Sequence, residues 1–206
     1  MGGMKIPFPA NASPRDRIII AAKHLMSAVG YENTTTEAIC REANASEAQL
    51  TKYFGTKEAL LQAIFEEGWA RLRMKIPMLQ TVQSPRNQIK MLIHLVIQGF
   101  SDDRPWRDLM LLEGRRIRGK GKMVILTAGY RELVGLLDSL ISAELKGKAS
   151  RHQVQLVRSS IIGVFEGLLR DLVLHERFDF PAEFSAEQVE HYIADVVDRL
   201  LRPAQR

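Results

Sequence analysis

The 206-residue chain contains a single cysteine, Cys40, and aromatic residues make up only 7% of it. One cysteine excludes an intramolecular disulfide and a cysteine-based zinc site. No apolar run approaches the roughly 18 residues that a membrane-spanning helix needs, and the first residues lack the apolar core of a secretory signal. Internal repeats and low-complexity tracts are absent as well. We therefore expect a globular protein of the reducing cytoplasm.

The excess of basic residues is small and unevenly placed. Lys and Arg number 29 against 24 Asp and Glu, which gives a formal net charge of +5. Residues 1–55 carry six bases and five acids, whereas five bases lie within eight residues at Arg115, Arg116, Arg118, Lys120 and Lys122. We expect this basic run to be a solvated junction, and the alternative is a contact with an acidic group of an effector. A modest basic excess suits a polyanionic partner without establishing one.

Proline and glycine fall mostly between segments with helical periodicity. Ser13-Pro14-Arg15-Asp16 has the residues of a capped helix start, and apolar residues at helical spacing follow until Gly30. Capping boxes that begin at Thr34, Ser46 and Ser185 predict further helix starts. These patterns predict about nine helices and no strand. The expected fold class is all-α, with a three-helix amino-terminal domain and a larger helical core.

The first 55 residues have the spacing of a helix-turn-helix. Small Cys40 follows large Ile39 where two helices must cross closely, and Asn44 falls at the turn, where a left-handed backbone is needed. Leu50 and Tyr53 are expected to anchor the second helix of the motif to the core. This leaves a set of residues available for the major groove of DNA: Glu47, Ala48, Gln49, Thr51 and Lys52.

Residues 15–65 resemble the DNA-binding domain of the tetracycline-repressor (TetR) family of bacterial transcriptional regulators. The resemblance rests on residues in fixed register: Gly30-Tyr31, the Thr34 to Thr36 start, Ile39, Ala43, Ser46, Leu50, Tyr53-Phe54 and Lys57 to Leu61. It implies a homodimer with a helical effector-binding core and a four-helix interface formed by the last two long helices of each chain. Two positions depart from the family pattern, since Thr51 replaces a Tyr that contacts phosphate and Asn44 replaces a Gly.

Chemistry and the resemblance together predict the DNA contacts. Groups at the starts of short helices suit phosphate, which favours Thr34 and Thr36, and the resemblance places Lys57 near the DNA backbone. Gln49 can read adenine, Ala48 can meet a thymine methyl and Glu47 can accept from cytosine. The alternative is that Glu47 and Gln49 only cap their helix. The predicted DNA-binding residues are Thr34, Thr36, Glu47, Ala48, Gln49, Thr51, Lys52, Tyr53 and Lys57.

Two further sets of residues are predicted from helical stripes. Because ligand pockets are mostly apolar, the predicted effector contacts are Trp69, Met91, His94, Phe100, Trp106, Met110, Phe165 and Glu166, although such stripes are more often simply core. Glu166 either anchors the effector or pairs with Arg170 one turn on. The predicted dimer interface comprises Gly163, Gly167, Val189, Ile193, Val196, Val197 and Leu200, with packing inside one chain as the alternative.

The sequence thus predicts a ligand-responsive regulator that binds double-stranded DNA. We expect a repressor that binds a palindromic operator as a homodimer and is released by a small-molecule effector. The expected domains are an amino-terminal arm at 1–12, a helix-turn-helix domain at 13–57, and an effector-binding and dimerisation domain at 58–206. No catalytic constellation, metal site or cofactor is expected. The alternatives are a helical ligand carrier or enzyme, and an architectural DNA binder, which would want more lysines than residues 1–60 offer.

Overall fold

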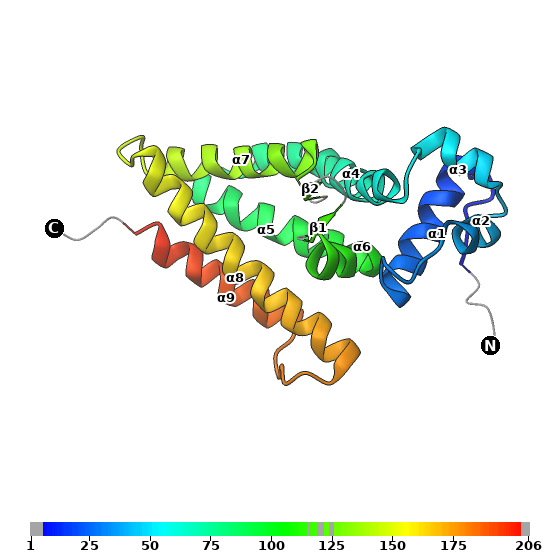
Figure 1. Ribbon diagram of the computed structural model, residues 1–206. Helices are drawn as coiled ribbons and strands as arrows, with labels where there is room; N and C mark the ends of the chain where they lie inside the picture. The colour runs from blue at the N-terminus through cyan, green and yellow to red at the C-terminus, as the bar shows by residue number, and fades with distance from the viewer. Residues whose placement is uncertain (1–5, 115, 119–121, 124–125, 203–206) are drawn as a thin grey trace. The chain divides into compact units, whose positions relative to one another are not determined.

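The computed structural model describes residues 6–114, 116–118, 122–123 and 126–202 (Figure 1). Within these ranges it contains nine α-helices: α1 (Pro14–Val29), α2 (Thr36–Glu42), α3 (Glu47–Phe54), α4 (Lys57–Lys75), α5 (Pro85–Asp102), α6 (Arg104–Asp108), α7 (Ala128–Glu144), α8 (Arg151–Phe178) and α9 (Ala186–Leu200). A 3-10 helix, η1 (Ile76–Thr81), follows α4, and a π-helical turn, η2 (Leu109–Glu113), follows α6. The predicted all-α class is confirmed.

A small hairpin is the one departure from the expectation of no strand. Strands β1 (Ile117–Arg118) and β2 (Lys122–Met123) pair antiparallel, with Arg118 opposite Lys122. They fall within the basic run of the sequence, of which Arg115 and Lys120 lie outside the described residues. Two strands of two residues each leave the fold class unchanged.

The helix starts follow from side-chain caps that the sequence encodes locally. Ser13, Ser46 and Ser185 each form a capping box with the residue three positions later, and a fourth box at Ser150 begins α8. The predicted box at Thr34 is wrong: Thr35 caps α2 by accepting a hydrogen bond from the Ala38 amide. Thr34 is buried instead, and its hydroxyl donates a hydrogen bond to the Gly30 carbonyl at 2.8 Å.

The chain divides into two compact units. The first unit comprises Met1–Gly68 with Asp103–Thr127, and the second comprises Trp69–Asp102 with Ala128–Arg206. The first unit therefore holds α1, α2 and α3, most of α4, and also α6, η2 and the hairpin. The sequence-derived boundaries after residues 12 and 57 stay a prediction.

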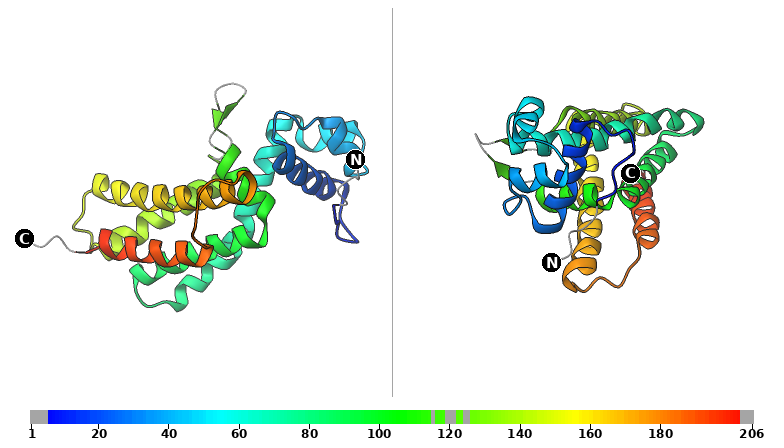
Figure 2. Two further views of the ribbon diagram at one scale, coloured as in Figure 1. Left: turned by 90° about the horizontal axis from the view of Figure 1, so that it is seen from below. Right: turned by 90° about the vertical axis from the view of Figure 1, so that its right-hand side faces the viewer.

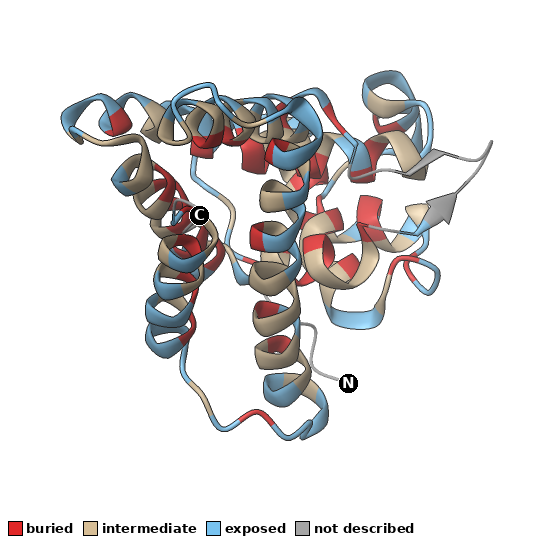
Figure 3. Cartoon of the chain, turned by 90° about the vertical axis from the view of Figure 1, so that its left-hand side faces the viewer, coloured by how far each residue is buried: buried red, intermediate tan, exposed pale blue. Residues whose placement is uncertain are grey.

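Four helices of the second unit form a bundle around a common core. Helix α5 packs against α7 and α9, and α8 packs against the same two helices. In Figures 1 and 2, α8 and α9 run side by side. Each helix buries an isoleucine almost completely, namely Ile89, Ile141, Ile161 and Ile193. Figure 3 shows many of the buried residues of these helices on their inner sides, with exposed residues on their outer turns.

Arg86 ties three helices of this bundle together. Its Nε donates to Glu144 at the end of α7 at 2.9 Å, and one terminal nitrogen donates to the Leu201 carbonyl after α9 at 2.7 Å. One turn later on α5, Lys90 lies 2.7 Å from Asp198 of α9. These partly buried ionic contacts fix the register of α9 against α5.

Candidate nucleic-acid interface

The turn between α2 and α3 has the backbone that its sequence predicts. Asn44 adopts a left-handed conformation with a φ of 46°, which confirms the predicted role of Asn at this position. The amide of Ala45 donates to the Cys40 carbonyl at 2.9 Å and closes the turn. Arg17 of α1 then holds the turn from outside, because its guanidinium donates to the carbonyls of Ala43 at 2.9 Å and Asn44 at 3.2 Å. No pattern in the sequence predicts this role of Arg17.

The helices of the motif cross over small and apolar side chains. Ile39 and Ala43 are fully buried, and Cys40 and Leu50 are nearly so. Burial raises the pKa of the Cys40 thiol, and the Glu47 carboxylate raises it further, so the reactive thiolate is disfavoured. Tyr53 differs from expectation: its side chain is 39% exposed and meets the Phe54 ring edge-on, so Tyr53 lies on the surface and does not anchor α3.

Helix α3 presents a polar face to solvent. Glu47, Ala48, Thr51 and Lys52 are all exposed. Gln49 is half-buried, and its side-chain oxygen accepts a hydrogen bond from the Ser46 amide at 2.9 Å. The structure therefore gives Gln49 the capping role that the sequence left as an alternative, and base reading by Gln49 stays a prediction.

Lys57 and Thr34 act inside the first unit. The Lys57 ammonium donates to the carbonyls of Tyr31 at 2.9 Å and Thr34 at 3.0 Å, and it lies 4.3 Å from the centre of the Tyr31 ring. Lys57 thus fastens the loop between α1 and α2 to the start of α4. The Thr34 hydroxyl is buried, whereas Thr36 is half-buried at the first position of α2. Phosphate contacts by these three residues stay predictions.

The predicted effector contacts divide between the two units. Trp106 and Met110 are buried in the first unit. In the second unit, the rings of Phe100 and Phe165 lie 6.2 Å apart, and Trp69 lies 5.7 Å from Tyr130. His94 Nδ1 of α5 is 2.7 Å from Glu190 Oε1 of α9, and Met91 is half-buried.

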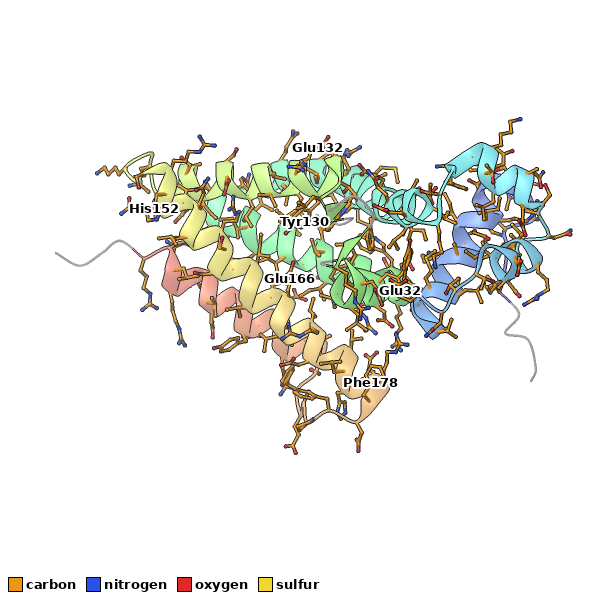
Figure 4. The ribbon with its side chains drawn as sticks, in the orientation of Figure 1. Glu32, Tyr130, Glu132, His152, Glu166 and Phe178 are labelled. Carbon is orange, nitrogen blue, oxygen red and sulfur yellow. The ribbon has the colours of Figure 1, made fainter. Side chains whose placement is uncertain are left out.

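Glu166 lies on α8 between His152 and Phe178, which mark the two ends of that helix in Figure 4. It is half-buried, like its neighbour Phe165. A groove of about 700 Å³ at the α7–α8 turn is lined by none of the predicted effector residues. Its walls come from Asp138, Ser139, Ser142, Ala143, Gly147, Ala149, Arg151, Val154 and Gln155.

Three of the predicted interface residues are buried within their own chain. Val189, Ile193 and Val197 are 2%, 0% and 0% exposed, because this face of α9 packs on α5 and α8 of its own chain. Val196 and Leu200 are half-buried, and nothing lies within 4 Å of where a Cβ would stand at Gly163 or Gly167. The apolar side chains exposed on these two helices include Leu156 and Tyr192, at 55% and 52%.

The described residues offer no group of three or more His, Cys, Asp or Glu that could hold a metal ion. Nor does any helix within the described ranges have the length and apolar character needed to cross a membrane.

Comparison with known proteins places the motif in a family. Residues 18–64, which contain α2, the turn and α3, match the family model of bacterial regulatory proteins of the tetR family. No curated protein matches the chain.

Several solved structures share the fold of the whole chain. The fatty acid degradation regulator FadR from Bacillus halodurans is 20% identical, with 96% of this chain and 100% of that chain covered and a TM-score of 0.75. FadR from Bacillus subtilis, solved in complex with stearoyl-CoA, is 16% identical, with coverage of 88% and 96% and a TM-score of 0.76. A putative tetR family regulator from Shewanella sp. PV-4 is 16% identical, with coverage of 92% and 96% and a TM-score of 0.68. Residues 18–64 therefore match the tetR family of bacterial regulatory proteins, and the chain as a whole shares the fold of these solved structures.

Proposed function

We propose that this DNA-binding regulator recognises an inverted-repeat operator as a homodimer, represses transcription, and is released from DNA by a small-molecule effector. The observation that carries the proposal is the exposed polar face of α3, held by a turn in which Asn44 is left-handed and Arg17 bonds two carbonyls. A helix presented in this way is suited to enter the major groove.

The residues of α3 divide by chemistry into specifying and positioning contacts. Glu47 accepts hydrogen bonds and Ala48 offers a methyl group, so both suit base edges. Thr51 and Lys52, one turn further on, suit phosphate oxygens, which fix register without reading sequence. Tyr53 joins this second group because its side chain is exposed. Gln49 contributes through the amide nitrogen that its cap leaves uncommitted.

A homodimer supplies two copies of α3. In a two-fold dimer the same patch pairs with itself, and the exposed residues of α8 and α9 offer such a patch. Leu156 and Gly163 are exposed on α8, and Tyr192 is exposed on α9, where half-buried Val196 lies one turn further on. Two recognition helices then meet successive major grooves about 34–36 Å apart, which requires an inverted repeat in the operator.

The effector is proposed to be a long-chain acyl thioester. The B. subtilis relative FadR was solved with stearoyl-CoA. The B. halodurans relative, also named FadR, is described as a fatty acid degradation regulator. In this chain the rings of Phe100 and Phe165, 6.2 Å apart, supply apolar side chains of the kind that an acyl chain would contact. Such an effector releases DNA if it binds more tightly to a conformation that cannot bind the operator than to the one that can. The ratio of its two affinities sets the largest possible loss of operator affinity.

Binding-site selection on random DNA tests the proposal, followed by titration of the selected duplex with stearoyl-CoA. We expect an enriched inverted repeat and release by stearoyl-CoA, with free coenzyme A as the control that lacks the acyl chain. Selected sequences without dyad symmetry would contradict the dimeric regulator. Release by neither compound, with a clear inverted repeat, would contradict the effector alone.

A further inference from the structure

The segment that follows α5 packs with the amino-terminal helices. Helix α6 and the turn η2 contact α1 within the first compact unit, although Lys23 and Asp103 lie 80 residues apart in sequence. Helix α5 ends at Asp102 and α6 begins at Arg104. Asp103 is therefore the single residue between a helix of the second unit and a helix of the first.

Contacts of the Asp103 carboxylate fix the start of α6. Its Oδ2 lies 2.5 Å from Lys23 Nζ of α1, and the two side chains are only 13% and 14% exposed. Its Oδ1 accepts a hydrogen bond from the Trp106 amide at 3.2 Å and caps α6. A largely buried ion pair is screened little by salt, and removal of one partner leaves an uncompensated charge. This pair therefore holds α6 firmly against α1.

Trp106 fixes α6 against α4. A Cβ added to Gly68 would lie 2.0 Å from Trp106 Cε2, so the indole occupies space beside the α4 backbone that only glycine leaves open. The indole is almost completely buried. Because Gly68 is the last residue of the first unit on α4, Trp106 joins the point where the chain leaves this unit to the point where it returns.

We propose that Asp103 and Trp106 are positioning residues for DNA binding, which hold α1 and α4 in place without touching DNA. The link to the interface runs along α1, since the helix that carries Lys23 also carries Arg17, which fixes the turn before α3. The part of the chain that supports the DNA-binding helices thus extends to residues 103–113, well beyond the matched segment 18–64. This inference rests on the proposed function.

The test measures operator affinity of the full chain by fluorescence anisotropy on the selected duplex. Asp103→Asn keeps an oxygen that can cap α6 and removes the charge, and Lys23→Gln removes the other partner. Each variant is expected to bind about tenfold more weakly. The double variant should bind no more weakly than the single ones, because all three break the same contact. Lys23→Arg keeps the positive charge and should bind the operator with wild-type affinity.

A neighbouring ion pair supplies the matched control. Asp102, one residue earlier, lies 3.5 Å from Lys75, with side chains 71% and 37% exposed. Asp102→Asn should change operator affinity by no more than about twofold, as for other exposed pairs. Circular dichroism and urea unfolding establish that each variant is folded at the temperature of the binding measurement. Trp106→Phe tests the α4 contact separately if a charge variant does not fold.

The salt dependence of binding separates positioning from direct contact. Because neither Asp103 nor Lys23 neutralises a phosphate in this account, the salt slope of the variants should equal that of the wild-type chain. Wild-type affinity in the folded variants would overturn the proposal, and so would a loss accompanied by a smaller salt slope. A wild-type chain that selects no DNA would instead overturn the proposed function, and this inference with it.

Discussion

At the scale of single residues, Gly68 shows how the absence of a side chain permits a helix contact. The Trp106 indole lies where a Cβ would stand, so Gly68→Ala forces the ring or the helix to move. We expect the free energy of unfolding to fall by about 1–3 kcal/mol, which is the usual cost of overpacking a core. Gly135→Ala on α7 is the control, because nothing lies within 4 Å of its Cβ position. Urea unfolding measures both, and equal effects would contradict the packing described.

His24 makes the stability of the first unit depend on pH. Burial lowers the pKa of His24, the Lys23 ammonium lowers it further, and the Asp103 carboxylate opposes them. Below about pH 6.5, the ordinary value, the unfolded chain therefore binds more protons at this site than the folded chain. Stability should rise with pH through the window between the lowered pKa and the ordinary one, and fall as the pH drops.

Substitution of His24 tests whether this residue makes the free energy of unfolding rise with pH. Urea unfolding of wild type and His24→Gln across that window should show a shallower pH dependence in the variant. His152→Gln, at an exposed position on α8, serves as the control. A variant whose stability falls as steeply as that of the wild type would remove His24 from this account.

At the scale of secondary structure, the two faces of α9 give opposite expectations. Val197 is fully buried inside its own chain and Tyr192 is 52% exposed. Val197→Asp should unfold the second unit, since it buries an unpaired charge. Tyr192→Asp should leave the helix content unchanged and weaken the proposed dimer. Sedimentation and circular dichroism separate these outcomes, and a folded, dimeric Tyr192→Asp protein would place the interface elsewhere.

What the sequence predicts at this scale depends on how local the signal is. Serine caps at Ser13, Ser46 and Ser185, and the left-handed Asn44, follow from neighbours within a few residues. The periodicity of α9 predicts an apolar face but not its partner, so it does not distinguish a second chain from the rest of the same chain, which covers Val189 and Ile193. No local pattern links Lys23 to Asp103 across 80 residues, and nothing distinguished Arg17 from a solvated arginine.

At the scale of the whole molecule, the net charge is too small to account for DNA recognition, which must depend on geometry. The net charge of the chain is only +5, and residues 1–55 are nearly neutral, so electrostatic attraction alone gives little affinity. Specific binding must come from α3 and from the symmetric presentation of two copies. An operator of matching symmetry is therefore the strongest consequence of the account.

The most direct measurement compares operator affinities of the wild-type chain and Lys52→Ala on the selected duplex and on a duplex with one half-site scrambled. The account predicts that wild type binds the intact repeat at least about tenfold more tightly than the scrambled duplex, because each mismatched base pair costs about 1–3 kcal/mol. Lys52→Ala should weaken binding to both duplexes and lower the salt slope by roughly 1 per half-site. Equal wild-type affinity for the intact and scrambled duplexes, or an unchanged salt slope and affinity in Lys52→Ala, would contradict DNA recognition through α3.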